Sequence, residues 1–194
     1  MRKSEQVITT KGSSTRDRIV KGARKQLVER GYETFVMREL AHNLGIKLGN
    51  LQYYFKTREA LILYVIEQEG TQDVLSIQAQ RQKWDTAGGA FRAIVREMVV
   101  RWRGSSGVLF STLGMLAMHN KLYKQLYRTI YENFYLALEV PLREMNPGLS
   151  DEEIVMRVRL ISALIDGSPM QIQVGSVQNY LDRVQGQAEV IALA

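Results

Sequence analysis

Helical periodicity runs through almost the whole chain and constrains its fold more than any other feature. Between Phe91 and Trp102, apolar residues recur with the three- and four-residue spacing of one helix face. Similar stripes cover the ranges 16–30, 121–145, 151–168 and 177–194. No segment alternates polar and apolar residues for long enough to predict a strand. The sequence therefore predicts an all-α protein.

Glycine residues indicate where the first helices end. Gly31 is expected to cap the helix 16–30, and Gly45 separates two short helices. These short helices are predicted at 37–44 and 48–55. Thr57 is expected to cap a further helix, which stops near Gly70.

Breaks are also expected in the remainder of the chain. The sequence GSSG at 104–107 predicts an interruption before a helix at 108–119. Pro141 would kink the helix 121–145 or end it early. Gly167, Ser168 and Pro169 are expected to disturb the helix 151–168.

The positive charge is concentrated in the first third of the sequence. The whole chain of 194 residues carries a formal charge of +6. Residues 1–58 contain 13 Lys and Arg residues against 5 Asp and Glu residues, whereas residues 59–194 contain 13 against 15. A basic segment of net charge +8 on a nearly neutral body favours a module that binds a polyanion. The alternative is a basic, solvated N-terminal tail.

Composition excludes several classes of chemistry. The chain has no Cys and only two His residues, His42 and His119, which excludes disulfide scaffolds, thiolate zinc sites, thiol nucleophiles and histidine-rich metal sites. We therefore expect no cofactor and no metal. No apolar run is long enough to span a membrane and no secretory leader is evident, so we expect a cytoplasmic protein without a membrane partner.

The spacing around Gly45 is that of a helix-turn-helix. Leu40 and Ala41 precede the glycine, and Ile46 and Leu51 follow it. The small Ala41 allows the two helices to approach closely, and Gly45 permits a tight turn. In such a unit the second helix enters the DNA major groove.

The segment 31–61, GYETFVMRELAHNLGIKLGNLQYYFKTREAL, resembles the DNA-binding domain of the tetracycline-repressor (TetR) family of bacterial transcriptional regulators. The matching residues are Gly31, Tyr32, Arg38, Leu40, Ala41, Gly45, Ile46, Gly49, Leu51, Tyr54, Phe55, Thr57, Arg58, Glu59 and Leu61. The resemblance is strong over residues 15–66. Beyond Gly70, the length, the helical content and the sequence Ile165-Asp166-Gly167 agree with the family.

The resemblance implies four parts of the chain. They are a flexible tail at 1–14, a three-helix helix-turn-helix DNA-binding domain at 15–58, a linking helix at 59–70, and a larger helical regulatory and dimerisation domain at 71–194.

Three positions depart from the family pattern. Val36 replaces the Ser or Thr that usually caps the second helix, and Thr34 is a candidate to take over this capping. Lys47 replaces the Ser that usually caps the recognition helix, which exchanges a backbone cap for a phosphate contact. Gln52 stands where Tyr is usual, and a glutamine amide is able to read adenine.

The predicted DNA contacts follow from these matches. Asn50 and Gln52 are the best candidates for reading bases, while Leu48 is placed to touch a thymine methyl group. Gly49 allows close backbone approach. Leu51 and Phe55 are interpreted as core residues. The full candidate set is Arg16, Arg38, Lys47, Leu48, Gly49, Asn50, Gln52, Tyr53, Tyr54, Lys56, Thr57 and Arg58.

The body is expected to dimerise and to bind a small molecule. The ranges 121–145 and 151–168 carry apolar residues more widely than one core contact needs, and the resemblance implies that they form a homodimer interface. A symmetric dimer would read an inverted-repeat operator on double-stranded DNA. The candidate effector pocket contains Trp102, Phe110, Met115, Met118, Tyr123 and Tyr127, although such stripes also occur in ordinary cores.

The most direct interpretation is a homodimeric repressor that a small-molecule effector releases from its operator. The alternative is an effector-independent DNA-binding protein with a structural or protein-recruiting role. An enzyme is not expected, because the sequence has no glycine-rich phosphate loop and no Ser-His-acid set.

Overall fold

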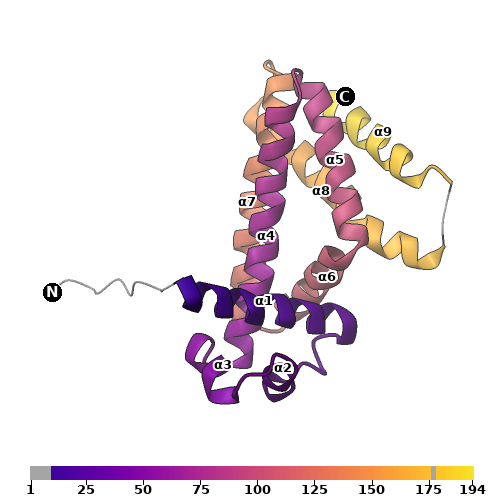
Figure 1. Ribbon diagram of the computed structural model, residues 1–194. Helices are drawn as coiled ribbons and strands as arrows, with labels where there is room; N and C mark the ends of the chain where they lie inside the picture. The colour runs from indigo at the N-terminus through magenta and orange to yellow at the C-terminus, as the bar shows by residue number, and fades with distance from the viewer. Residues whose placement is uncertain (1–9, 176–177) are drawn as a thin grey trace. The chain divides into compact units, whose positions relative to one another are not determined.

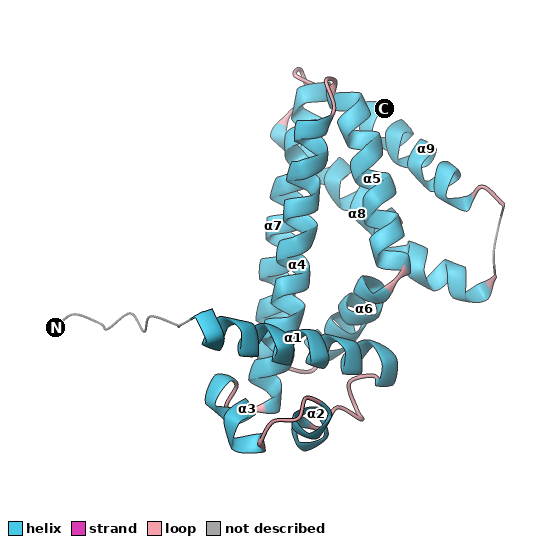
Figure 2. Ribbon diagram, in the orientation of Figure 1, coloured by secondary structure: helices cyan, strands magenta, loops and turns pink. Residues whose placement is uncertain are grey.

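The computed structural model describes residues 10–175 and 178–194, and these residues form only helices and loops (Figure 2). The prediction of an all-α fold is therefore confirmed. In chain order the helices are α1 (Thr10–Arg30), α2 (Met37–Asn43), α3 (Leu48–Tyr54), α4 (Arg58–Lys83), α5 (Ala87–Arg103), α6 (Ser105–Ala117), α7 (Lys121–Met145), α8 (Asp151–Val174) and α9 (Tyr180–Leu193), as labelled in Figure 1. Over the described residues, no helix has the length and apolar character that crossing a membrane requires.

The chain forms two compact units, Met1–Ile66 and Glu67–Ala194. Helix α4 begins in the first unit and continues into the second. In the first unit, α1 contributes Ile19, Ala23 and Leu27 to a small core, all of them buried. Gly31 ends α1 at a φ of +80°, a conformation that glycine adopts without the steric cost of a side chain.

The N-terminal helix begins earlier than the sequence predicts. Residues 10–14 belong to α1 and not to a flexible tail, while residues 1–9 lie outside the described part of the chain. Polar residues give no apolar stripe that would mark this extension. A helix already nucleated at 16–30 nevertheless gains one backbone hydrogen bond for each residue it adds, and no proline interrupts it here.

Helix α4 does not stop at Gly70, so that prediction is wrong. The helix continues to Lys83, and Gly70 is buried within it. A Cβ at this position would lie 2.9 Å from Cγ2 of Ile130 on α7. The glycine therefore allows two helices of the second unit to pack closely, and it does not mark a helix end.

The expected break at 104–107 is confined to Gly104. Helix α6 begins at Ser105 and ends at Ala117, so the prediction of a helix over 108–119 placed both ends too late. Gly107 lies inside the helix, where a Cβ would come within 1.9 Å of the Trp102 carbonyl oxygen. This glycine allows the tight corner between α5 and α6.

The two long helices tolerate the residues that were expected to disturb them. Helix α7 has the predicted bounds and runs through Pro141 without ending early, and α8 runs through 167–169 to Val174. Pro141 is buried, so its packing offsets the backbone hydrogen bond that proline cannot make. The last predicted stripe began at Val177, which lies outside the described residues, and α9 begins at Tyr180.

The core of the second unit is built around α5. The predicted stripe from Phe91 to Trp102 is buried along its whole length, which confirms the amphipathic interpretation of that segment. Helices α6, α7, α8 and α9 all pack against α5.

Candidate nucleic-acid interface and ligand cavity

Helices α2 and α3 form a helix-turn-helix. Leu40 and Ala41 of α2 and Leu51 of α3 are buried where the helices meet. Gly45 turns the chain between them at a φ of +66°. The Ile46 N–H donates to the Ala41 carbonyl at 3.0 Å and fixes the start of the second segment. The predicted roles of Ala41 and Gly45 in the turn agree with this geometry.

Helix α3 presents a polar face to solvent. Its exposed residues are Lys47 at the helix start, Gly49, Asn50, Gln52 and Tyr53. Leu48 is half-buried, whereas Leu51 and Phe55 are buried, which confirms the interpretation of the last two as core residues. This surface carries amide, amine and phenol groups, which donate or accept hydrogen bonds at base edges and phosphates.

Gly49 has no structural reason within the chain to be glycine. A Cβ at this position would meet nothing within 4 Å, and the backbone is not in the left-handed region. Glycine also weakens a helix relative to alanine. A glycine on an exposed helix also leaves space for another surface to approach its backbone closely.

The two adjacent tyrosines have different surroundings. Tyr53 is 75% exposed, while Tyr54 is half-buried and meets the Tyr53 ring edge-on at a centroid distance of 5.2 Å. Arg38 of α2 is exposed, and so are Lys56 and Thr57, which follow α3 in the sequence. Thr57 also caps α4, as predicted, because its Oγ1 accepts a hydrogen bond from the Ala60 N–H at 3.1 Å.

Thr34 does not replace the missing cap of α2. Its hydroxyl donates to the Arg30 carbonyl at 2.6 Å, so it is bound to the end of α1 instead. Val36 occupies the N-cap position of α2 and Lys47 that of α3, and neither makes a side-chain cap hydrogen bond.

Two of the arginines predicted to contact DNA are engaged within the first unit. Arg58 donates from Nε to the Phe35 carbonyl at 3.0 Å and from Nη2 to the Tyr32 carbonyl, and its guanidinium lies 4.1 Å from the Tyr32 ring centroid. Arg16 lies over the Tyr64 ring at 4.2 Å. Arg58 therefore holds the loop between α1 and α2 against the start of α4, a role that sequence patterns did not reveal.

The second unit contains a cavity of about 290 Å³ lined by α5, α6, α7 and α8. It brings together five of the six predicted effector residues, which are Trp102, Phe110, Met115, Met118 and Tyr127. Tyr123, the sixth, is buried and is not among the residues that line the cavity. Because the register of the helix decides which aromatic residues face inward, sequence spacing alone does not separate Tyr123 from Tyr127.

Aromatic rings form much of the cavity wall. Trp102 and Phe110 are stacked with centroids 4.6 Å apart, and Tyr127 is stacked on Tyr131 at 4.3 Å. Met115 and Met118 are both exposed, so flexible thioether side chains border the cavity.

Asp166 lines the same cavity and was not among the predicted effector residues. Its Oδ2 accepts a hydrogen bond from the Tyr131 hydroxyl at 3.1 Å. Burial raises the pKa of Asp166 to about 7, and the hydrogen bond from Tyr131 opposes this rise only in part. A carboxylate among the buried apolar residues Ile161 and Ile165 is the sequence signal that would have identified it.

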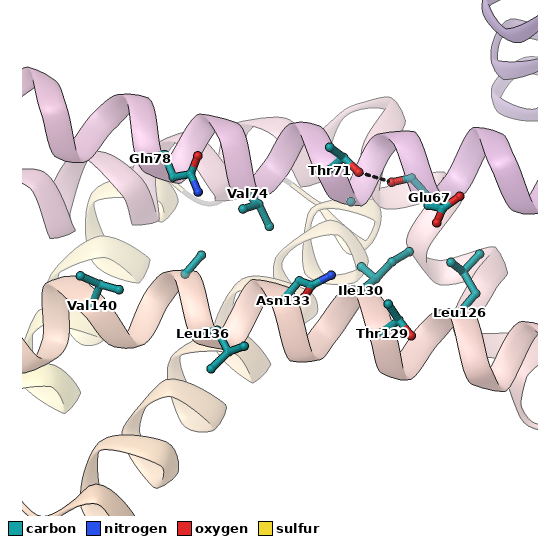
Figure 3. A pocket seen from close by; sticks show the side chains of 12 residues that line it. Glu67, Thr71, Val74, Gln78, Leu126, Thr129, Ile130, Asn133, Leu136 and Val140 are labelled. Atoms are coloured by element: carbon teal, nitrogen blue, oxygen red, sulfur yellow. Dashed lines mark hydrogen bonds between the residues drawn. The ribbon is translucent and has the colours of Figure 1, made fainter. Parts of the chain in front are cut away.

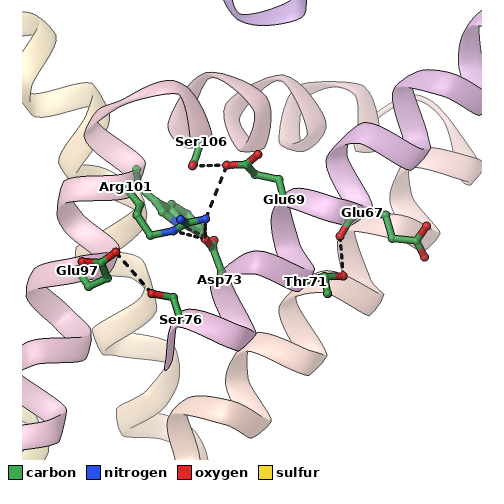
Figure 4. Close-up of polar contacts among 9 residues, drawn as sticks. Glu67, Glu69, Thr71, Asp73, Ser76, Glu97, Arg101 and Ser106 are labelled. Atoms are coloured by element: carbon green, nitrogen blue, oxygen red, sulfur yellow. Dashed lines mark hydrogen bonds and ion pairs between the residues drawn. The ribbon is translucent and has the colours of Figure 1, made fainter. Parts of the chain in front are cut away.

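A buried polar cluster connects this cavity with α4. Arg101 Nε donates to Oδ1 of Asp73 at 2.7 Å (Figure 4). The Trp102 indole N–H donates to Oδ2 of the same carboxylate at 2.8 Å. Glu69, one turn earlier on α4, accepts from the Ser106 hydroxyl. Three helices are thus joined by charge-assisted hydrogen bonds in a region of low solvent access.

A second depression of the same unit runs between α4 and α7 (Figure 3). Val74 and Ile130 give it an apolar floor, while Glu67, Gln78 and Asn133 bring polar groups. The Thr71 hydroxyl in this depression donates a hydrogen bond to the main-chain carbonyl of Glu67 at 3.0 Å.

A three-helix unit with an exposed polar helix after the turn has the architecture of helix-turn-helix DNA-binding domains. Residues 19–65 match the family model for bacterial regulatory proteins of the tetR family. The first unit is therefore a tetR-family DNA-binding domain, which confirms the resemblance found in the sequence. No curated protein matches the chain in sequence.

Solved structures share the fold over most of the chain. A TetR transcription regulator from Haloarcula marismortui has a TM-score of 0.77 at 17% identity, over 93% of this chain and 97% of that chain. A transcriptional regulator from Saccharomonospora viridis in complex with choline has a TM-score of 0.74 at 19% identity, over 91% and 94%. A TetR-family regulator from Mesorhizobium loti has a TM-score of 0.75 at 13% identity, over 95% and 96%. At these identities, the likeness shows the fold.

Proposed function

We propose that this protein is a homodimeric transcriptional repressor that releases its operator when a small molecule binds in the aromatic cavity. The observation that carries the proposal is the solvent-facing surface of α3, which exposes Gly49, Asn50 and Gln52. Leu51, on the opposite side of the helix, is buried in the core. The proposed activity is the binding of DNA and ligand, without a chemical step.

The exposed residues divide into base readers and phosphate binders. The amides of Asn50 and Gln52 have the paired donor and acceptor that match adenine in the major groove. Lys47 and Lys56 are exposed ammonium groups, which attract phosphates without regard to sequence. The guanidinium donors of Arg58 are engaged within the unit, so its contribution is to position the α1–α2 loop.

Homodimerisation is supported by exposed apolar residues on α7 and α8. Leu136 of α7 and Met156 and Leu160 of α8 are each at least half exposed, although other residues of both helices form the core. A symmetric dimer would place two recognition helices about one turn of DNA apart, roughly 34 Å, and would thus read an inverted repeat.

Release by a small molecule is supported by the cavity and its connection to α4. The Saccharomonospora viridis regulator contains choline, so a protein of this fold accommodates a small ligand. In this chain, Trp102 both lines the cavity and donates a hydrogen bond to Asp73 of α4. A ligand that displaces the indole would therefore disturb the helix that starts in the DNA-binding unit.

Selection from randomised double-stranded DNA, followed by fluorescence anisotropy at fixed salt, tests the DNA-reading part. We expect an inverted repeat to be enriched. Asn50→Ala and Gln52→Ala should each lose about 1 to 3 kcal/mol of discrimination between selected and scrambled DNA. Lys56→Ala should weaken binding to both about equally. Lys25→Ala, which removes an exposed lysine of α1, is the control for net charge.

A uniform loss for all three variants would refute base reading by Asn50 and Gln52. Ligand release is tested separately by a thermal-shift screen of metabolites, because a ligand that binds the native state raises the melting temperature. If hits do not reduce operator binding, the protein is an effector-independent DNA-binding protein.

A further inference from the structure

Asp166 is a half-buried carboxylate whose charge lacks compensation within the described residues. Its Oδ1 is shielded from solvent and accepts no hydrogen bond from them, and its Oδ2 has the Tyr131 hydroxyl at 3.1 Å. The two buried carboxylates of this unit, among the described residues, are different. Asp73 and Glu69 lie 2.7 Å and 3.7 Å from the guanidinium of Arg101. A carboxylate oxygen that is shielded from solvent without a cation nearby is costly, and Asp166 lines a cavity.

Among the described residues, no cationic side chain lines the cavity beside Asp166. The phenols of Tyr131 and Tyr135 on α7 interact electrostatically with Asp166, and Tyr127 of the same helix lines the same cavity. Arg159 lies on the same helix, with its guanidinium 5.5 Å from the centroid of the Tyr135 ring. Helices α5 and α6 contribute only uncharged residues to the cavity lining.

The cavity wall is rich in aromatic rings. Trp102, Phe110, Tyr127 and Tyr131 lie in two stacked pairs, and Trp102 also meets Tyr131 edge-on at 6.3 Å. The faces of aromatic rings carry negative potential and attract cations, most strongly alkylammonium groups that shed water easily. An anion would be repelled by Asp166, and a neutral ligand would leave its charge uncompensated.

We propose that this cavity binds a small alkylammonium ion, with the Asp166 carboxylate as counter-charge and the aromatic rings as walls. The volume of about 290 Å³ accommodates a small molecule, and the bordering Met115, Met118 and Met170 adapt to its remaining groups. The regulatory meaning of this binding rests on the proposed function, because the ion would then be the effector.

Binding of such an ion depends on the protonation state of Asp166. Burial raises the pKa of Asp166 to about 7, so the carboxyl group loses its proton between pH 6 and pH 8. The neutral form attracts no cation. Affinity should therefore rise about tenfold from pH 6 to pH 8 for a ligand that does not itself titrate. Burial also raises the pKa values of Tyr131 and Tyr135, which keeps both phenols protonated in this range.

Isothermal titration calorimetry with the full chain and three probes of similar shape tests the proposal. The probes are tetramethylammonium, neutral tert-butanol and anionic pivalate. We expect saturable binding of tetramethylammonium at pH 8, with tert-butanol at least tenfold weaker and pivalate weaker still. Asp166→Asn should reduce tetramethylammonium affinity at least tenfold and remove its pH dependence. Glu152→Gln, an exposed carboxylate on the same helix, should change neither.

Three outcomes would overturn the proposal. They are equal binding of tert-butanol and tetramethylammonium, unchanged tetramethylammonium affinity in Asp166→Asn, and absence of tetramethylammonium binding to the native chain. Circular dichroism confirms that each variant is folded. Anisotropy on the selected DNA separates this proposal from the proposed function. DNA binding without cation binding refutes only this inference, whereas cation binding without DNA binding refutes only the proposed function.

Discussion

At the scale of single residues, Gly49 tests whether the backbone of α3 approaches DNA closely. The space around its Cα is open and its backbone is ordinary, so Gly49→Ala should stabilise the first unit by up to about 1 kcal/mol. The added methyl group would hold α3 away from DNA. We expect at least a tenfold loss of operator affinity by anisotropy, together with an unchanged or higher melting temperature. Native operator affinity in this variant would show that the backbone does not approach DNA closely.

Asp166 should make the stability of the ligand-free protein depend on pH. The pKa of Asp166 is about 7 in the folded chain and near the ordinary value of 3.8 in the unfolded chain, so the folded state holds its proton more tightly. The stabilising contribution of Asp166 to the free energy of unfolding is therefore fully present below pH 4, and it is lost as pH rises towards 7. The loss amounts to at most about 4 kcal/mol.

Urea unfolding between pH 4 and pH 8 measures this loss. Asp166→Asn should flatten the fall in the free energy of unfolding, whereas Glu152→Gln should leave it in place. An equal fall in the native chain and in Asp166→Asn would mean that other groups cause it.

At the scale of helices, the corner between α5 and α6 depends on Gly107. A Cβ there would lie 1.9 Å from the Trp102 carbonyl oxygen and 3.1 Å from Cγ of Pro169. Backbone atoms move less easily than side-chain ends, so Gly107→Ala should lower the free energy of unfolding by about 2 to 4 kcal/mol. Gly114→Ala on the same helix is the control, because its Cβ would meet Tyr127 at an ordinary 3.7 Å. Similar stabilities of the two variants in urea would contradict this account.

At the scale of the whole molecule, the proposed dimer makes a prediction for Leu160. This residue is 50% exposed on α8, and Leu160→Glu would bury a charge in an interface. Sedimentation at micromolar concentration should give a dimer for the native chain and a monomer for this variant, with a large loss of operator affinity. Leu75→Glu tests the same change at a 49% exposed position of α4, and it should remain dimeric. A monomeric native chain would refute the homodimer.

Coupling between cavity and DNA is also a property of the whole molecule. Trp102→Phe keeps an aromatic ring in the cavity wall but removes the hydrogen bond to Asp73. We expect operator binding without ligand to remain, while the same ligand occupancy releases less DNA. Ligand titrations followed by calorimetry and anisotropy measure occupancy and release on one sample. Full release at equal occupancy would show that this hydrogen bond does not transmit the signal.

The sequence by itself determined the parts of the protein that depend on local order. Helical periodicity, the glycine at 45 and the buried pattern of Leu51 and Phe55 involve residues close together in the chain, so the all-α fold and the helix-turn-helix were predictable. The bounds of α7 were also predicted, because its stripe is long and regular.

Tertiary structure decided what residues distant in sequence do to one another. From the sequence, Gly70 predicted a helix end, and Gly107 belonged to a predicted break. In the structure both glycines lie inside helices and allow close packing against a neighbouring helix. Arg58 has its hydrogen-bond partners 23 and 26 residues away, and Asp166 has its partner 35 residues away. Such contacts depend on how the helices pack. The pKa of a carboxyl group rises, and aromatic rings come to lie beside it, only when several helices surround it.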